Sequence, residues 1–322
     1  MDLSIIIVNW NSKEYLRNCI ASILATTRGI EFQIVVIDNA SFDGCDQMLR
    51  QYYPQVRFIQ SNHNLGFAKA NNAAFRESCG RYILFLNPDT ELVAPAVNIM
   101  FDYLQRLPNA GAVNCKLLNA DKTIQTSCIQ SFPTILNQLL DSELLRAFRP
   151  KSPLWGMAPL FGAENGPEEV EALSGACLML KRTLFEQVGL FSEDYFMYAE
   201  DVDLCYRIRQ AGYKNYYVPN TTVVHLGGGS TQKGPSDFSV VIMHESVWRF
   251  MRKTRGKLYG LAYRASTLIS AIGRMALLVI VLPLHLIQRG RESWNASLRK
   301  WKAILAWSLG IEASVRKNPW DY

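Results

Sequence analysis

The amino-acid sequence predicts an α/β fold built on a doubly wound, mostly parallel sheet. In its first half, uninterrupted apolar runs alternate with segments whose apolar residues recur at helical spacing. Such runs are typical of strands buried on both faces of a parallel sheet. Right-handed crossovers place consecutive strands of this kind parallel to one another. With 322 residues the chain has room for one large domain and an appendage.

The expected elements follow in order along the chain. Ser12 is expected to cap the first helix, and Pro95–Leu107 reads as a helix with proline in its first turn. A later helix ends at Gly212. Residues 127–169 have no regular pattern and are expected to form a long loop over an acceptor site. The expected strands are Leu3–Val8, Phe32–Ile37, Val56–Ile59, Tyr82–Leu86, Ala112–Leu118, Glu171–Lys181, Tyr213–Val218 and Thr221–His225.

Polar residues follow the first, second and fourth of these strands. They include Asn9, Asp38 and Asp89. Ligands of open parallel sheets bind outside the carboxyl ends of the strands, so this repetition favours a ligand crevice over independent turns. No GxGxxG and no GxxxxGK[ST] motif occurs, so nucleotide recognition would use side chains. Asp38 could accept a hydrogen bond from a base or ribose. Lys69 could offset the negative charge of a phosphate, or it could be only a solvated residue on a helix.

Two further sites contain titratable side chains. Asp89 could hold Mg²⁺ or Mn²⁺ against phosphates, or could belong to a simple Asn-Pro-Asp turn. Glu200, Asp201 and Asp203 crowd the amino end of a helix, which the helix dipole alone would explain. Mutual repulsion would also raise a pKa there and create a proton acceptor. His225, before three glycines, is either a metal ligand or phosphate contact or a structural histidine.

Seven segments together resemble the inverting family 2 glycosyltransferases, most closely the bacterial rhamnosyltransferases of polysaccharide assembly. They span about Leu3 to Thr231 and occur in the family's order. The segments are LSIIIVNWNS (from Leu3), VVIDNASFDG (from Val35), NLGFAKANNAAF (from Asn64), YILFLNPDTEL (from Tyr82), SGACLMLKR (from Ser174), MYAEDVDLCYR (from Met197) and HLGGGST (from His225).

The resemblance implies a GT-A fold, a nucleotide-sugar donor such as a dTDP- or UDP-sugar, a divalent cation and inversion at the anomeric carbon. Asp89 matches the last acid of the family's DxD motif, with Asn87 in place of the first acid, and His225 would complete the metal site. Asp201 matches the catalytic base, with Glu200 and Asp203 supporting it. The implied donor-binding residues are Asn9, Asn11, Asp38, Asn39, Gly66, Lys69, Asn71 and Asn87.

The C-terminal segment differs in charge from the rest of the chain. From Arg249 to Lys302, twelve Lys and Arg side chains and one acid, Glu292, give +11, whereas the whole chain carries +6, which leaves −5 elsewhere. Residues 275–287 have no formal charge, but this run is shorter than a spanning helix needs and contains Pro283. We expect a GT-A domain over residues 1–238 and a helical, monotopic or peripheral membrane-associating region over 239–322. A buried helical hairpin is the alternative.

The expected location is the cytoplasmic face of the inner or plasma membrane. No secretory signal peptide is expected, and seven scattered cysteines without a CxxC pattern favour a reducing compartment. The expected reaction moves a sugar, rhamnose being favoured, to a lipid-linked or polysaccharide acceptor, with no nucleic-acid partner. A nucleotidyltransferase and a non-catalytic membrane adaptor are the competing functions. Neither explains the residues as well, because the first lacks a basic phosphate loop and the second gives Asp89, Asp201 and His225 no purpose.

Overall fold

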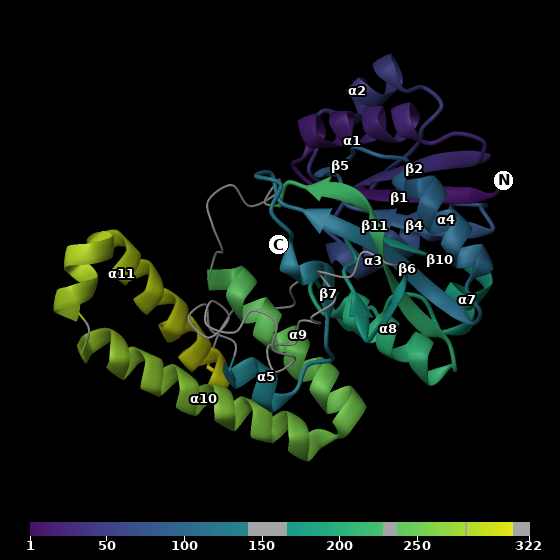
Figure 1. Ribbon diagram of the computed structural model, residues 1–322. Coiled ribbons are helices and arrows are strands. Elements are labelled where there is room, and N and C mark those ends of the chain that lie inside the picture. The colour runs from purple at the N-terminus through teal and green to yellow at the C-terminus, as the bar shows by residue number, and fades with distance from the viewer. Residues whose placement is uncertain (141–165, 228–236, 281, 312–322) are drawn as a thin grey trace. The chain divides into compact units, whose positions relative to one another are not determined.

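A computed structural model describes residues 1–140, 166–227, 237–280 and 282–311 (Figure 1). The chain forms two compact units. The first comprises Met1–Phe132, Lys151–Phe196 and Glu200–Gln232, and the second comprises Pro133–Pro150, Met197–Ala199 and Lys233–Tyr322. Each unit is described separately below.

A mixed sheet forms the centre of the first unit, and its strand order is β3-β2-β1-β4-β10-β6-β11-β5, with β8 paired to β11. Strands β1 to β4 are mutually parallel, as predicted, whereas β10 is antiparallel between β4 and β6. The strands are β1 (Leu3–Asn9), β2 (Phe32–Asp38), β3 (Arg57–Gln60), β4 (Tyr82–Leu86), β5 (Thr90–Leu92), β6 (Ala110–Leu118), β8 (Glu168–Val170), β10 (Cys177–Lys181) and β11 (Lys214–His225), and β7 (Ile129–Gln130) pairs with β9 (Ala172–Leu173) separately.

Helices pack on this sheet and follow the strands as expected. Helix α3 lies against β1 and β2, α4 against β6 and β10, and α8 against β6 and β11. Strands β1 and β4 contribute fully buried aliphatic and aromatic side chains to the core between sheet and helices. The helices are α1 (Lys13–Thr26), α2 (Cys45–Tyr52), α3 (Gly66–Arg76), α4 (Ala96–Arg106), α7 (Arg182–Gln187) and α8 (Glu200–Gln210), with a 3₁₀ turn at Thr126–Cys128.

Several local expectations differ from the structure. The expected strand Glu171–Lys181 is divided into β9 and β10, and the described part of residues 127–169 contains β7, α5 (Ile135–Leu140) and β8. The rest of that expected loop, residues 141–165, lies outside the described residues.

The segments Tyr213–Val218 and Thr221–His225 belong to one strand, β11, whose register against β6 shifts between Val218 and Thr222. Pro219 lies in that shift, where a missing N–H interrupts the ladder without ending the strand. Ser12 stands at the N-cap of α1, but its hydroxyl donates to the Trp10 carbonyl, and Asp43 Oδ2 accepts the Lys13 N–H at 2.9 Å.

The second unit is helical and contains α5 (Ile135–Leu140), α9 (Asp237–Arg255), α10 (Lys257–Ile280) and α11 (Leu282–Ser308). Helix α10 packs on α9 and α11, and its buried side includes Tyr263, which joins Trp307 in the core. The Arg264 guanidinium donates to the Trp307 carbonyl at 2.6 Å. This hydrogen bond and the packing on α9 and α11 cover one side of α10 with protein.

The apolar run at residues 275–287 is not one continuous segment. It is divided between α10, which ends at Ile280, and α11, which begins at Leu282. Pro283 lies in the first turn of α11, where its missing N–H breaks no helical hydrogen bond. The length of the run at residues 275–287 therefore sets no limit on α10, which begins at Lys257. With 24 residues, α10 is the one described helix long and apolar enough to cross a membrane.

Candidate active site

Asn9 and Asp38, at the ends of β1 and β2, are both fully buried and bonded to each other. Asn9 Nδ2 donates to Asp38 Oδ1 at 2.8 Å and to Asp43 Oδ2 at 3.2 Å. Asp38 Oδ2 accepts the Ser41 N–H at 3.1 Å and the amide of Gln60 at 2.8 Å. Asp38 therefore organises the loop after β2, and a bound nucleotide would have to share or replace these donors.

The loop after β2 also brings together groups of a metal-ligating type. One ligand atom each from Asp38, Asp43 and Cys45 lies within 4.8 Å of the others. The amide nitrogen of Asn9 already donates to both carboxylates, which is the role a cation would have. Burial also raises the pKa of the Cys45 thiol, so the sulfur stays protonated. For Asp38, burial acts to raise the pKa, but hydrogen bonds led by those from Ser41 and Gln60 lower it below its usual value. We interpret this cluster as a hydrogen-bonded loop.

Asn39 and Gly66 connect the first strands to the segment before α8. Asn39 Oδ1 accepts the Leu65 N–H at 2.7 Å, which fixes the turn before α3. Gly66 has a φ of +70°, and a Cβ on it would lie 2.3 Å from the carbonyl oxygen of Phe196. The next residue, Phe67, donates its N–H to that same oxygen at 2.9 Å. Glycine at position 66 is therefore required for close backbone approach.

Replacing Gly66 by alanine is expected to destabilise the first unit by about 2–4 kcal/mol, because the Cβ adds a backbone clash to the cost of positive φ. Gly29 provides a matched control, since its φ is +68° and nothing lies within 4 Å of its Cβ position. Gly29→Ala should cost only about 1–2 kcal/mol, the conformational term. Thermal unfolding monitored by circular dichroism compares the two variants. Equal melting temperatures would remove the close-approach argument.

The other predicted donor-binding residues differ in their surroundings. Asn71 is buried and donates to the Phe67 carbonyl of its own helix at 3.0 Å. Lys69 is half-buried on α3, and Asn11 is exposed with a φ of +52°. Lys69 and Asn11 are thus the more accessible of these three side chains, whereas Asn71 supports the helix.

Asn87 and Asp89 follow β4 in a turn that leads into β5. Thr90 Oγ1 donates to the Asn87 carbonyl at 2.7 Å, and the Asp89 carbonyl accepts the Leu226 N–H at 2.9 Å. Thr90 pairs with His225 in the β5–β11 ladder. Pro88 and Asp89 form a turn, and this turn is compatible with a ligand role for the Asp89 carboxylate. The pairing also brings the end of β11 to Asp89.

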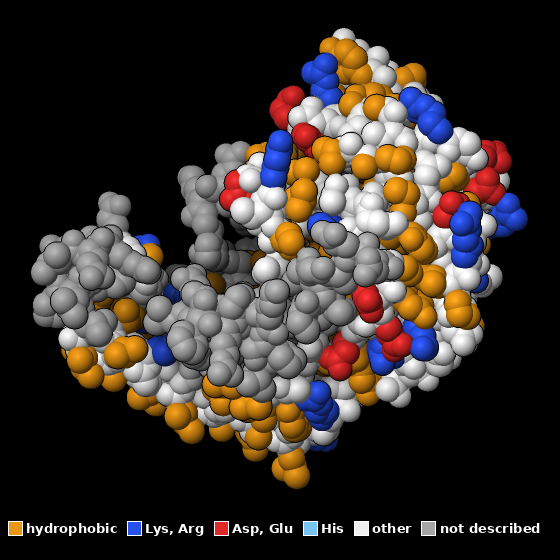
Figure 2. Space-filling model, in the orientation of Figure 1, with side chains coloured by type: hydrophobic (Ala, Val, Ile, Leu, Met, Phe, Trp, Pro, Cys, Tyr) orange, Lys and Arg blue, Asp and Glu red, His pale blue; other side chains and the backbone are white. Residues whose placement is uncertain are grey.

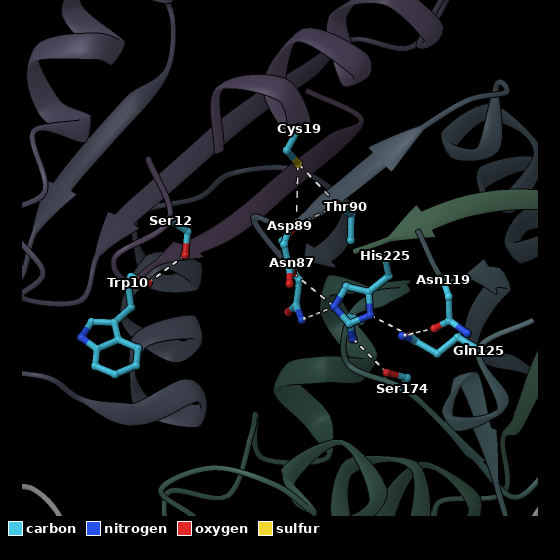
Figure 3. Close-up of polar contacts among 11 residues, drawn as sticks. Trp10, Ser12, Cys19, Asn87, Asp89, Thr90, Asn119, Gln125, Ser174 and His225 are labelled. Atoms are coloured by element: carbon cyan, nitrogen blue, oxygen red, sulfur yellow. Dashed lines mark hydrogen bonds and ion pairs between the residues drawn. The ribbon is translucent and has the colours of Figure 1, made fainter. Parts of the chain in front are cut away.

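The His225 imidazole lies between two groups of polar side chains (Figure 3). Its Nε2 is 3.2 Å from Asp89 Oδ1 and 3.2 Å from Asn87 Nδ2. Its Nδ1 is 2.7 Å from Gln125 Oε1. Adjacent ligands on an octahedral ion with bonds of about 2.1 Å lie about 3 Å apart, so Asp89 Oδ1 and His225 Nε2 fit one small divalent cation. Gln125 carried no signal in the sequence, because its neighbours form no recognisable pattern.

Asp201 stands in the first turn of α8 and is half-buried. Its Oδ2 accepts the Gly175 N–H at 2.8 Å, and its Oδ1 accepts the Val202 N–H at 2.8 Å. Two successive residues in front of α8, Tyr198 and Ala199, have φ angles of +71° and +61°. Left-handed backbone at two successive non-glycine residues costs about 1–3 kcal/mol each, and such strained residues cluster at functional sites.

The two other acids of α8 have different environments. Glu200 is 5% exposed, and among the described residues its Oε2 has no hydrogen-bond partner. Burial, followed by the charge of Asp201, raises the pKa of Glu200 well above its usual value. Burial also raises the pKa of Asp201, although the N–H groups of Gly175 and Val202 oppose this effect. Asp203 instead forms an ion pair with Arg207 at 2.7 Å.

One short segment, Ser174–Ala176, contacts both the acidic and the imidazole sites. The Gly175 N–H bonds to Asp201, and the adjacent Ala176 carbonyl accepts the Asn87 N–H at 2.9 Å. A Cβ on Gly175 would lie 3.3 Å from the Cβ of Asp201, so the small residue noted in the sequence allows approach to the carboxylate. Asp201 and the Asn87–Asp89 turn therefore bond to the same three-residue segment.

Comparison with known proteins shows where this arrangement belongs. A profile of Glycosyl transferase family 2 matches residues 4–143. The N-acetylglucosaminyl-diphospho-decaprenol L-rhamnosyltransferase of Mycobacterium tuberculosis is 31% identical over 261 residues, which cover 77% of this chain and 83% of that protein. The chain belongs to glycosyl transferase family 2.

Other relatives agree with this family 2 assignment. Rhamnosyltransferase WbbL of Escherichia coli K12 is 27% identical over 228 residues, which cover 69% of this chain and 82% of that protein. The solved mannosyltransferase PcManGT of Pyrobaculum calidifontis, in complex with GDP-Man and Mn²⁺, has a TM-score of 0.57 at 15% identity and covers 98% of this chain and 88% of its own. The fold is thus the GT-A fold, and this family 2 protein is a glycosyltransferase.

Proposed function

We propose that this enzyme is an inverting glycosyltransferase that moves a hexose, rhamnose being favoured, from a dTDP- or UDP-sugar to a lipid-diphosphate-linked saccharide. The printed name of the M. tuberculosis relative describes L-rhamnose transfer to such an acceptor, and the E. coli relative is also named a rhamnosyltransferase. Such a reaction belongs to cell-wall or polysaccharide biosynthesis.

The observation that carries this proposal is the Ser174–Ala176 segment between Asp201 and the Asn87–Asp89 turn. Inverting transfer needs a base on one side of the donor sugar and a positive group by the leaving diphosphate on the other. Asp201 removes the proton from the acceptor hydroxyl as that oxygen attacks the anomeric carbon. A bound Mg²⁺ or Mn²⁺ would stabilise the departing diphosphate, and Asp89 and His225 are the residues that would hold it.

Glu200 and Asp201 are expected to differ in protonation state. Asp201 accepts two backbone N–H groups that stabilise its ionised form, whereas Glu200 Oε2 has no such donor among the described residues. Glu200 is therefore the protonated member and Asp201 the ionised one, as the role of base requires.

A screen of nucleotide sugars tests the function. Purified protein is incubated with dTDP-rhamnose, UDP-glucose, UDP-GlcNAc or GDP-mannose, with and without a polyprenyl-diphosphate GlcNAc acceptor and with Mg²⁺, Mn²⁺ or EDTA. We expect release of dTDP that requires both the acceptor and the metal, and an inverted linkage in the product. Release of a sugar 1-phosphate instead, the leaving group of nucleotidyl transfer from these donors, would indicate a nucleotidyltransferase, and no turnover of any donor would favour a non-catalytic adaptor.

We further propose that α10 lies in the headgroup region of an anionic membrane, at the cytoplasmic face. Its exposed side carries Leu258, Leu261, Ile269, Ile272 and Val279, which are between 54% and 83% exposed. Figure 2 shows hydrophobic side chains along the edge where Figure 1 draws α10. Its other side packs on α9 and α11. An exposed apolar stripe within a segment of +11 net charge is typical of an in-plane membrane helix.

Flotation with vesicles tests the membrane surface. The wild-type protein should float with vesicles containing phosphatidylglycerol and bind phosphatidylcholine vesicles more weakly, and salt should reduce binding without abolishing it. The double variant Ile269→Asp, Ile272→Asp should lose most of its binding, because it places two charges in the apolar stripe. Val93→Asp is the matched control, since Val93 is 61% exposed but lies outside this unit.

Two results would contradict the in-plane position of α10. The first is equal flotation of the double variant and the wild type. The second is protease protection of a C-terminal tag inside sealed vesicles, which would show that α10 spans the bilayer.

A further inference from the structure

A chain of hydrogen bonds connects Asp121, on the turn after β6, to His225 at the end of β11. Thr123 Oγ1 donates to Asp121 Oδ1 at 2.6 Å, and Asn119 Nδ2 donates to Thr123 Oγ1 at 2.9 Å. Gln125 Nε2 donates to Asn119 Oδ1 at 3.2 Å. The chain ends with Gln125 Oε1, 2.7 Å from His225 Nδ1 (Figure 3).

The carboxylate of Asp121 sets the direction of this chain. An ionised carboxylate only accepts hydrogen bonds, so the Thr123 hydroxyl must point its proton at Asp121. Hydrogen bonds from the Thr123 hydroxyl and backbone N–H lower the pKa of Asp121, which keeps it ionised. The Thr123 oxygen then accepts from the amide of Asn119, so the oxygen of Asn119 faces Gln125. By the same step the oxygen of Gln125 faces His225.

We propose that Gln125 is a positioning residue that holds the neutral His225 with its proton on Nδ1, leaving the Nε2 lone pair directed at Asp89. An amide oxygen 2.7 Å from Nδ1 requires a donor there and excludes the tautomer protonated only on Nε2. In metal-binding histidines the hydrogen bond of one ring nitrogen decides which nitrogen is free to bind. The inference rests on the proposed role of His225 as a metal ligand.

The contact between Asn87 and Nε2 agrees with this tautomer, whereas the contact with Asp89 adds a condition to it. Asn87 Nδ2 lies 3.2 Å from Nε2 and is a donor suited to a lone pair. Asp89 Oδ1 lies 3.2 Å from the same nitrogen. A lone pair and a carboxylate oxygen at this separation repel each other unless a cation lies between them. The arrangement set by Gln125 therefore favours a cation shared by Asp89 and His225.

Two variants of Gln125 separate its acceptor role from a packing role. Gln125→Met has a similar volume but cannot accept the Nδ1 proton, so the proton is free to move to Nε2, where Asp89 accepts it. Gln125→Glu keeps an acceptor oxygen and should retain the Nδ1–H tautomer. Gln130→Met is the matched control, because Gln130, in β7, donates to the carbonyl of Ser127 in the adjoining 3₁₀ turn. Thermal unfolding of each variant reports whether it is folded.

Nitrogen-15 NMR of histidine-labelled full-length protein, at a pH of about 8.5 where imidazoles are neutral, reads the tautomer directly. The chain has four histidines, so a His225→Gln spectrum identifies the signals of His225. We expect Nδ1–H in the wild type, Gln125→Glu and Gln130→Met, and Nε2–H in Gln125→Met. An Nε2–H tautomer in the wild type, or an unchanged tautomer in Gln125→Met, would overturn the inference.

Binding of Mn²⁺, followed by electron paramagnetic resonance of the free ion, is a second readout. Loss of a partner that orients a metal ligand typically weakens affinity by about 10–100-fold, which we expect for Gln125→Met but not for Gln125→Glu. If His225→Gln itself leaves Mn²⁺ affinity unchanged, His225 is not a ligand and that part of the proposed function fails. The tautomer assignment would still stand on the NMR result.

Discussion

Asp201→Asn is expected to reduce sugar transfer by on the order of 10²-fold or more, because the amide keeps the shape of the carboxylate but cannot take a proton. Donor binding should change by only a few fold, since the Asn87–Asp89 turn is untouched. Measurement of kcat for transfer together with donor affinity by calorimetry separates these effects. A variant with more than about a tenth of the wild-type rate would remove Asp201 as the base.

The neighbouring acid provides the control for this prediction. Glu200 is buried, Oε2 lacks a partner among the described residues, and the raised pKa keeps the side chain protonated. Glu200→Gln mimics that neutral form and should keep transfer within about tenfold of wild type. If Glu200→Gln were as inactive as Asp201→Asn, the roles of the two acids would have to be exchanged.

The pH dependence follows from the same environment. Asp201 acts when ionised, and burial raises its pKa, so activity should be lost on acidification at a higher pH than an ordinary aspartate would give. The pH profile of kcat/KM of the wild type should show this loss of activity on its acidic limb, and Glu200→Gln should keep the acidic limb. Disappearance of the limb in Glu200→Gln would show that it belongs to Glu200.

Asp89→Ala is expected to weaken both donor binding and turnover, with kcat/KM lower by on the order of 10²-fold, because it removes the only carboxylate we assign to the cation. EDTA should have the same effect on the wild type, and added Mn²⁺ should reverse it. Asp89→Asn keeps the size of the side chain and should bind Mn²⁺ as poorly as Asp89→Ala. Asp102→Ala, at an exposed position on α4, is the control. Full activity of the wild type in excess chelator would leave Asp89 as a turn residue.

Much of the first unit could be predicted from local patterns. The apolar runs of β1, β2 and β4 gave strands in the observed places and parallel to one another, because burial on both faces removes polar residues from a strand. The antiparallel orientation of β10 beside β4 could not be predicted from the sequence. An apolar run such as Cys177–Lys181 is compatible with either strand direction. The strand break expected near Pro219 was wrong, because pairing on both sides of the register shift holds β11 together.

Residue types pointed to Asp89, His225 and the acidic group at the start of α8 as candidates, because carboxylate and imidazole groups at the ends of strands and helices often serve capping or chemistry. The family resemblance then singled out Asp201 within that group. The assignment of a proton to Glu200 depended on burial and on a missing partner, which local sequence does not record. Likewise the sequence grouped Asp203 with Glu200 and Asp201. The structure distinguishes Asp203 from them because its carboxylate forms an ion pair with Arg207.

The sequence by itself determined the family and the parallel core and singled out the candidate site residues, since these depend on periodicity and on residues close together in the chain. Tertiary structure alone decided which groups meet. His225 reaches Asp89 through strand pairing, Gly175 reaches Asp201 because it lacks a side chain, and Gln125 reaches His225 across the sheet edge. These contacts join residues far apart in sequence, and their energies depend on distance and burial, which no local pattern encodes.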